Sequence, residues 1–171
     1  MITIRPEQSK DIAGVRAINE MAFDGTEEAK IVDSLRNACP DAVSLVAVED
    51  ERILGHILFS PVLVSGGQEV TRGMGLAPMA VLPERQRQGI GSMLVQTGIK
   101  EMRERNCPFI IVLGHPEYYP RFGFVPASNH GLSCQWDGIP DEAFMVLILD
   151  EAAMADVSGT ARYRGEFDQA M

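Results

Sequence analysis

The feature that most constrains the fold is a purely apolar run, "FIIVL" at 109–113, which closely follows an amphipathic segment. In that segment, 91–105, the apolar residues Val95, Ile99 and Met102 recur in steps of four and three, the spacing of one helix face. A strand without polar residues is typical of the middle of a sheet whose two faces are both covered. These two patterns therefore predict a central sheet with helices on both faces, an α/β arrangement.

The rest of the chain continues this alternation of strand and helix patterns. Short apolar runs bounded by turn residues predict further strands at 2–6, 43–49, 53–64, 75–83 and 143–150. Pro61 falls inside the third of these, so we expect an interruption or a sheet edge there. Apolar residues at helical spacing predict two more helices, at 12–23 and 26–40.

Length and charge narrow the class of protein. No repeat or linker divides the chain, so we expect a single domain over 1–171, with a core of about 1–150 and a weakly patterned C-terminal tail, 151–171. The formal net charge of −9 disfavours nucleic acid as a partner, because phosphate neutralisation needs excess Lys and Arg. No apolar run approaches the ~20 residues of a membrane span, and no signal peptide is apparent, so we expect no membrane partner.

The cysteines and histidines are scattered. Cys39, Cys107 and Cys134 are odd in number, widely spaced and form no CxxC, which predicts reduced thiols and a cytoplasmic location. Neither they nor the three histidines have the spacing of a structural zinc site, so we expect no metal.

One loop carries the strongest functional signal. The stretch "RQRQGIG", 85–91, lies where an apolar strand gives way to the predicted helix. The first turn of a helix has N–H groups without partners and a partial positive charge, and glycines let a ligand approach them. This predicts an anion site for a phosphate or pyrophosphate, with Arg85 and Arg87 adding positive charge. Glycines that only permit close packing on the sheet would leave the same pattern.

Two familiar phosphate loops fail on direct inspection. The dinucleotide fingerprint G-x-G-x-x-G/A needs a small residue where this chain has Leu94. A P-loop needs a Gly-Lys pair, which the chain lacks. A serine hydrolase is also disfavoured, because no G-x-S-x-G is present.

A third pattern matches at every position. "V-x-P-x-x-Q-x-x-G-I-G", 81–91, resembles the acetyl-coenzyme A (acetyl-CoA) motif of the GNAT superfamily of N-acetyltransferases, and "YPRFGF", 119–124, resembles that family's later Y-x-x-x-G-F. The segment "LGHPEYYPRFGFVPAS" is similar to the YhbS-like bacterial branch. The resemblance implies a GNAT-like α/β fold: a mixed, mostly antiparallel sheet, splayed at the cofactor cleft and flanked by helices.

The resemblance also implies how acetyl-CoA is held. The backbone of Met79, Ala80 and Val81 would follow the pantetheine arm, and an N–H near Val81 would bond the thioester carbonyl. The pyrophosphate would lie on the loop and the helix start, namely Gln86, Arg87, Gln88, Gly89, Ile90, Gly91 and Ser92. No metal takes part.

Acetyl transfer to an amine needs a proton donor for the leaving thiolate and a proton acceptor for the amine. By resemblance, Tyr119 is the donor, although a shift of one residue would put Tyr118 in its place. His56 is the candidate base, because imidazole titrates near ~6.5 and the residue could face the cleft.

Other groups could also take the amine proton. His115 and a chain of water molecules are alternatives, and carboxylates of the second helix (Glu27, Glu28 and Asp33) could contact a cationic acceptor. Cys107 and Cys134 are expected to be buried, unreactive thiols.

Two functions remain open at this stage. One is an acetyl-CoA-dependent N-acetyltransferase that acts by direct transfer on a small-molecule or peptide amine. The other is a non-catalytic acyl-CoA-binding sensor on the same fold, which needs the phosphate site but no proton donor. The oligomeric state stays open at this stage; a homodimer is one possibility, by analogy with similar folds.

Overall fold

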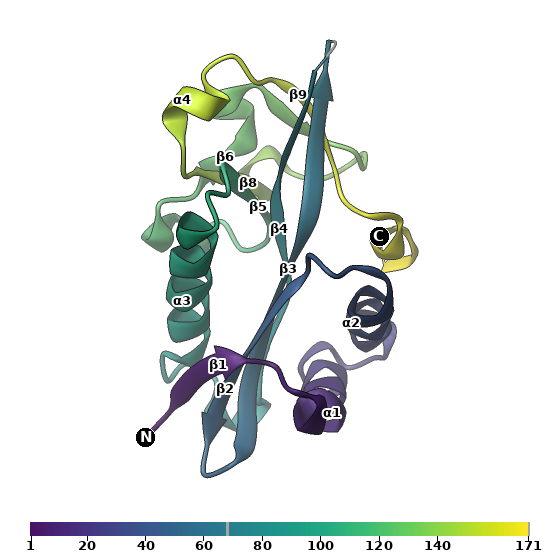
Figure 1. Ribbon diagram of the computed structural model, residues 1–171, viewed down its shortest axis with the longest axis vertical. Coiled ribbons are helices and arrows are strands. Elements are labelled where there is room, and N and C mark those ends of the chain that lie inside the picture. The colour runs from purple at the N-terminus through teal and green to yellow at the C-terminus, as the bar shows by residue number, and fades with distance from the viewer. Residues whose placement is uncertain (68, 171) are drawn as a thin grey trace.

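The computed structural model describes residues 1–67 and 69–170 (Figure 1). Its strands are β1 (Thr3–Pro6), β2 (Val43–Glu49), β3 (Arg52–Gly66), β4 (Glu69–Val81), β5 (Phe109–Leu113), β6 (Val125–Pro126), β7 (Leu132–Cys134), β8 (Phe144–Ile148) and β9 (Gly159–Arg162). Its α-helices are α1 (Ile12–Phe23), α2 (Glu27–Ala38), α3 (Ile90–Glu104) and α4 (Glu151–Met154). Short 3-10 turns are η1 (Ser9–Asp11), η2 (Pro83–Arg85), η3 (Tyr119–Phe122), η4 (Ala127–His130), η5 (Asp141–Ala143) and η6 (Gly165–Ala170).

The strands form one sheet of mixed polarity in the order β1-β2-β3-β4-β5-β8-β6, and β9 joins it by pairing with both β3 and β7. Most neighbours are antiparallel; β4 with β5 and β7 with β9 run parallel. The expected fold class, a mixed and mostly antiparallel sheet with flanking helices, is confirmed.

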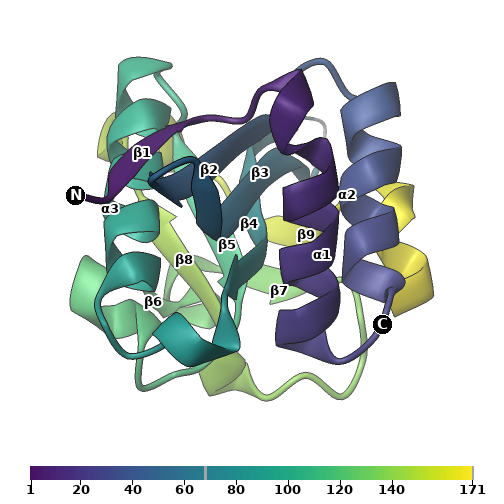
Figure 2. The same ribbon diagram turned by 90° about the horizontal axis from the view of Figure 1, so that it is seen from below.

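Helices cover both faces of the sheet, as the apolar strand at 109–113 predicts. Helix α3 lies on one face and α1 with α2 on the other (Figure 2). Side chains of β2 alternate between the two cores: Leu45 and Ala47 pack with α3, and Val46 packs with α2. The central part of the sheet is therefore buried on both faces, which fixes the direction of its side chains.

Strand β3 runs unbroken through Pro61, so the expected interruption is wrong, whereas the expected sheet edge at this point is confirmed. Pro61 pairs with Met74 of β4. On its other edge, the β2 register ends at Phe59 and the β9 register begins at Leu63. Pro61 thus lies in a gap between two neighbours within the described part of the sheet, where a missing N–H costs no ladder bond.

The strands β4 and β5 separate along their length. Their pairing begins at Met74 with Ile110 and ends at Leu76 with Val112. Beyond this point β4 continues for five residues, to Val81, whereas β5 ends at Leu113. Just past that point the β3–β4 register shifts, between the pairs Phe59–Leu76 and Ile57–Met79, so that β4 carries a bulge. Bulges bend a strand and are common beside functional sites. The result is an open β4 edge over residues 77–81.

The weakly patterned tail is part of the folded structure. Strand β9 pairs with β3 and β7, and η6 packs against α2. The C-terminus accordingly lies beside α2 (Figure 1). Among the described residues, no helix is long and apolar enough to span a membrane.

Candidate active site

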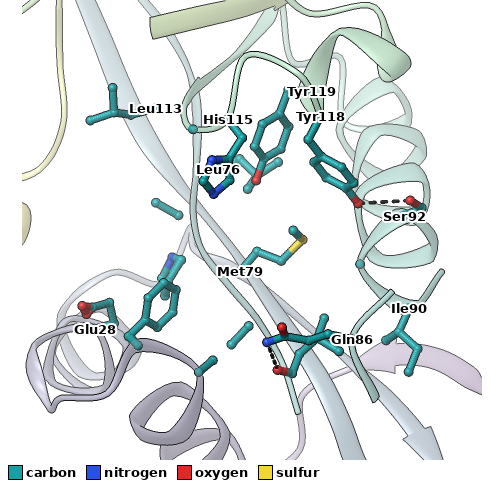
Figure 3. A pocket seen from close by; sticks show the side chains of 18 of the residues that line it. Glu28, Leu76, Met79, Gln86, Ile90, Ser92, Leu113, His115, Tyr118 and Tyr119 are labelled. Carbon is teal, nitrogen blue, oxygen red and sulfur yellow. Dashed lines mark hydrogen bonds between the residues drawn. The ribbon is translucent and has the colours of Figure 1, made fainter. Parts of the chain in front are cut away.

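A cleft of about 1030 Å³ opens where β4 and β5 separate (Figure 3). One side is the open edge of β4 with the loop and first turn of α3. The other is formed by α1, α2 and the C-terminal segment, and the ends of β5 and η3 lie between them. Residues from widely separated parts of the chain therefore meet around one space.

The β4 edge presents backbone groups to the cleft. The Leu82 N–H donates to the Leu54 carbonyl of β3 at 2.9 Å. Because successive strand residues direct their N–H and C=O groups to alternate edges, those of Val81 and Met79 point away from β3. The Val81 carbonyl accepts a hydrogen bond from Gln86 Nε2 at 3.1 Å, which ties the loop to the strand (Figure 3).

The loop then turns sharply into α3. Arg87 and Gly89 both have left-handed backbones, with φ of 65° and 86°. The Met93 N–H donates to the Gly89 carbonyl at 3.0 Å. Since this bond belongs to the first helical turn, the N–H groups of Ile90, Gly91 and Ser92 have no partner within the helix. These are the free donors on which the predicted anion site depends.

The two glycines differ in what they allow. A Cβ on Gly89 would meet no atom within 4 Å, so packing does not require this glycine. A Cβ on Gly91 would lie 3.2 Å from the Tyr118 hydroxyl. Close packing against Tyr118 therefore explains in part why position 91 requires glycine, whereas Gly89 borders open space in the cleft.

The loop side chains divide into two groups. Arg87 lines the cleft. Arg85 instead pairs with Glu49 at 3.2 Å and donates to Gln88 Oε1 at 2.9 Å. Neither Arg85 nor Gln88 lies along the described wall of the cleft. The expectation that Arg85 adds positive charge at the anion site is wrong, because its guanidinium is held by Glu49 of β2. Gln88 supports the loop through its side chain.

The two adjacent tyrosines have different surroundings. The Tyr118 hydroxyl lies 3.1 Å from Ser92 Oγ, at the start of α3. Tyr119 is only 6% exposed, and its ring stacks edge-on against Tyr118 and Phe124. Figure 3 shows its hydroxyl pointing into the cleft between His115 and Met79. Burial, with a smaller contribution from Tyr118, raises the pKa of Tyr119, so its hydroxyl stays protonated.

Gly114 makes room for Tyr119. A Cβ at this position would lie 2.5 Å from the Tyr119 ring. The glycine at the end of β5 is thus a packing requirement that fixes where the tyrosine hydroxyl points.

His56 does not face the cleft. Its side chain is completely buried between the two helices and the sheet, with Asn19 Nδ2 3.1 Å from Nδ1 and Ser44 Oγ 2.8 Å from Nε2. Burial, and then the charge of Arg36, lower the pKa of His56 to about 3. This corrects the expectation for His56: such an imidazole neither reaches a substrate nor accepts a proton near neutral pH. His115, by contrast, lines the cleft beside Tyr119.

Of the three candidate carboxylates, one reaches the cleft. Glu28 lines it, Glu27 is exposed outside it, and Asp33 pairs with Arg16 and Arg36. No group of three His, Cys, Asp or Glu side chains suited to a metal ion occurs in the described part of the chain. Cys107 and Cys134 are only partly buried, which corrects the expectation that both are buried. Partial burial still raises the pKa of each thiol, which agrees with low reactivity.

Comparison with known proteins decides the family. The model of the acetyltransferase (GNAT) domain matches residues 3–127. The chain belongs to the GNAT family. It is similar to the uncharacterised N-acetyltransferase YhbS of Escherichia coli K12, with 36% identity over 97% of this chain and 98% of that protein.

Two solved GNAT structures resemble this one over almost its whole length. The crystal structure of E. coli YhbS in complex with CoA has a TM-score of 0.90 at 35% identity, covering 98% of this chain and 92% of that one. A GNAT acetyltransferase from Brucella melitensis in complex with acetyl-CoA has a TM-score of 0.79 at 35% identity, covering 98% and 99%.

Sequence analysis missed several residues of this GNAT cleft. Trp136, Tyr163 and Phe167 line it together with Phe23 and Ile31. The first three lie beyond the residues that the family model matches. Aromatic residues dispersed over 32 positions leave no spacing signal.

Proposed function

We propose that this protein is an acetyl-CoA-dependent N-acetyltransferase that moves the acetyl group directly to a primary amine. The observation that carries the proposal is the meeting, in one cleft, of an anion-binding helix start, an open strand edge and the hydroxyl of Tyr119. The similarity to two GNAT structures that contain CoA or acetyl-CoA supports it.

The residues present fit CoA. A pyrophosphate needs converging N–H donors and no competing side chain, and Gly89 leaves open space in front of the α3 start. Arg87 and Arg121 line the same end of the cleft and provide positive charge for phosphates. The proposed binding residues are Met79, Ala80, Val81, Gln86, Arg87, Gly89, Ile90, Gly91 and Ser92. Gln88 acts indirectly, by holding Arg85.

The chain's own groups would serve the transfer as follows. When bound, acetyl-CoA supplies an acetyl group activated as a thioester. The Val81 N–H, directed into the cleft, is placed to donate to the carbonyl oxygen as negative charge develops there. The Tyr119 hydroxyl, kept protonated by burial, gives its proton to the departing sulfur as the carbon–sulfur bond breaks.

We propose His115 as the group that accepts the amine proton. Its imidazole lies in the cleft wall on the same side as Tyr119 (Figure 3). A buried imidazole such as that of His56 cannot replace it.

The alternative, a non-catalytic acyl-CoA sensor, keeps the phosphate site but has no use for a hydroxyl aimed at the acyl end of the cleft. The test is incubation with acetyl-CoA and a panel of primary amines, with N-acetyl products and free CoA measured by mass spectrometry. An enzyme gives equal amounts of both with at least one amine. Binding of acetyl-CoA with no product from any amine would favour the sensor.

We also propose a cytoplasmic location, supported by the free thiols of Cys39, Cys107 and Cys134. A homodimer stays a prediction by analogy, to be measured by light scattering.

A further inference from the structure

The two ends of the cleft carry opposite charge. Arg87 and Arg121 lie at the loop end, and Arg121 stacks over the Tyr118 ring at 5.0 Å. Glu28, on α2, lies at the far side of the cleft from Gln86 and Ser92 (Figure 3). It is the one carboxylate among the described lining residues. A ligand that spans the cleft therefore contacts two cationic side chains at one end and a carboxylate at the other.

Two buried oxygens at the Glu28 end have no hydrogen-bond partner. Only four buried side-chain oxygens in the described part of the chain lack one, and two of these are Glu28 Oε2 and Tyr163 Oη. Both residues line the cleft, and Tyr163 is only 8% exposed. Leaving such a group unsatisfied is unfavourable, so this end of the cleft is suited to a ligand that supplies the missing partners.

The rest of this end is apolar and aromatic. Tyr163 packs between Trp136 and Phe167, with ring centroids 5.2 Å apart in both pairs. A Cβ at Gly75 would lie 2.8 Å from the Tyr163 ring, so this glycine of β4 makes room for the cluster. Ile31 belongs to the same apolar cluster, one helical turn after Glu28.

Resting on the proposed function, we propose that this end of the cleft is the acceptor site, and that it selects a small cationic amine on a flat apolar body. Glu28 attracts the ammonium form of the amine into this end of the cleft, where Trp136 and Phe167 contact the body, before His115 takes the amine proton. The C-terminal segment 159–168 is thus a specificity element of the enzyme.

Physical chemistry favours this class over other amines. A half-buried carboxylate without a partner attracts a cation and repels a second carboxylate. Aromatic faces bind apolar surface and also attract cations, tryptophan most strongly. Burial raises the pKa of Tyr163, so its hydroxyl is neutral and can donate a hydrogen bond. An amino acid, which brings a carboxylate, and a purely aliphatic diamine each satisfy only part of this set.

The test compares phenethylamine, phenylalanine and putrescine as acceptors at saturating acetyl-CoA. Phenethylamine should have a kcat/KM at least about tenfold higher than either of the others. Glu28→Gln should lower kcat/KM for phenethylamine about 30-fold or more, as expected when one partner of a buried charge pair is lost. Glu27→Gln, an exposed neighbour outside the cleft, is the matched control and should leave it unchanged. Trp136→Leu should raise the KM for phenethylamine and leave the Kd of CoA unaltered.

Binding of phenethylamine to the CoA-loaded protein, measured by calorimetry, separates the two claims. Glu28-dependent binding without acetylation of any amine would support the acceptor site and count against the proposed enzyme. Acetylation that is equally efficient with phenylalanine or putrescine, or an equal effect of the Glu28 and Glu27 substitutions, would overturn the inference and leave the proposed enzyme standing. Loss of CoA binding in Glu28→Gln would also overturn it.

Discussion

Gly89 offers the sharpest test of the phosphate site. We expect Gly89→Glu to weaken CoA binding strongly, because it places a carboxylate at the mouth of the anion site. The side chain would extend into open space, since a Cβ there meets no atom within 4 Å. Any effect on CoA therefore comes from charge and bulk in the cleft rather than from disturbed packing.

The magnitude has two parts. A residue with a Cβ in the left-handed region, as at φ 86°, costs about 1–2 kcal/mol in folding stability whatever its side chain. A negative charge about 4 Å from a phosphate charge costs about 1 kcal/mol in water and about 4 kcal/mol at an effective dielectric constant near 20. At about 1.4 kcal/mol per decade, the Kd of CoA should rise about 5-fold to about 700-fold.

Three control variants separate these parts. Gly89→Ala carries the backbone cost without the charge. Gly67→Ala and Gly67→Glu repeat both substitutions in the turn between β3 and β4, away from the cleft. There φ is 78° and a Cβ also meets no atom within 4 Å. Kd is measured by isothermal titration calorimetry and stability by thermal melts. All four variants should lose similar stability, and only Gly89→Glu should lose much affinity. A Kd for Gly89→Glu within about twofold of that for Gly89→Ala would refute the placement of the pyrophosphate.

Three further predictions concern the reaction and the buried histidine. Tyr119→Phe should lower kcat about 100-fold or more with the Kd of acetyl-CoA nearly unchanged, whereas Tyr118→Phe should affect kcat much less; equal losses in steady-state assays would remove the special role of Tyr119. Gly114→Ala should also lower kcat more than it weakens CoA binding, because its Cβ would lie 2.5 Å from the Tyr119 ring, and an unaltered kcat would contradict that packing. Because the pKa of His56 is lowered to about 3, the unfolded state binds the proton first, so stability should fall as pH drops from about 6.5 towards 3, by up to about 1.4 kcal/mol per pH unit. His56→Gln should reduce this slope in urea unfolding between about pH 7 and pH 5, and an unchanged slope would show that His56 is not the titrating group.

The sequence was informative where a local pattern fixes the structure. Helix α3 is predicted at 91–105 and spans 90–104, and the left-handed Gly89 lies at its start as the glycine pattern suggests. These features depend on residues close together in the chain, whose periodicity and backbone preferences act locally. The strand at 43–49 agrees for the same reason.

Other features depend on contacts between distant segments. Strand periodicity places His56 on one face, but only the packing of α1 decides that Asn19 covers it. Pro61 fits inside β3 because, along one edge of this strand, the pairing with β2 ends before Pro61 and the pairing with β9 begins after it. The aromatic end of the cleft is formed by α2 and by the C-terminal segment, more than a hundred residues later, so no local sequence pattern could predict it.

The most direct test of the central claim, that the cleft binds acetyl-CoA, is a thermal melt of the purified protein with acetyl-CoA, CoA, NAD and ATP in parallel. A ligand that binds only the folded state stabilises it by RT ln(1 + [L]/Kd), about 2.7 kcal/mol at a hundredfold excess over Kd. The account predicts a higher Tm with both CoA species and no comparable change with NAD or ATP. No rise with either CoA species, or an equal rise with ATP, would contradict it.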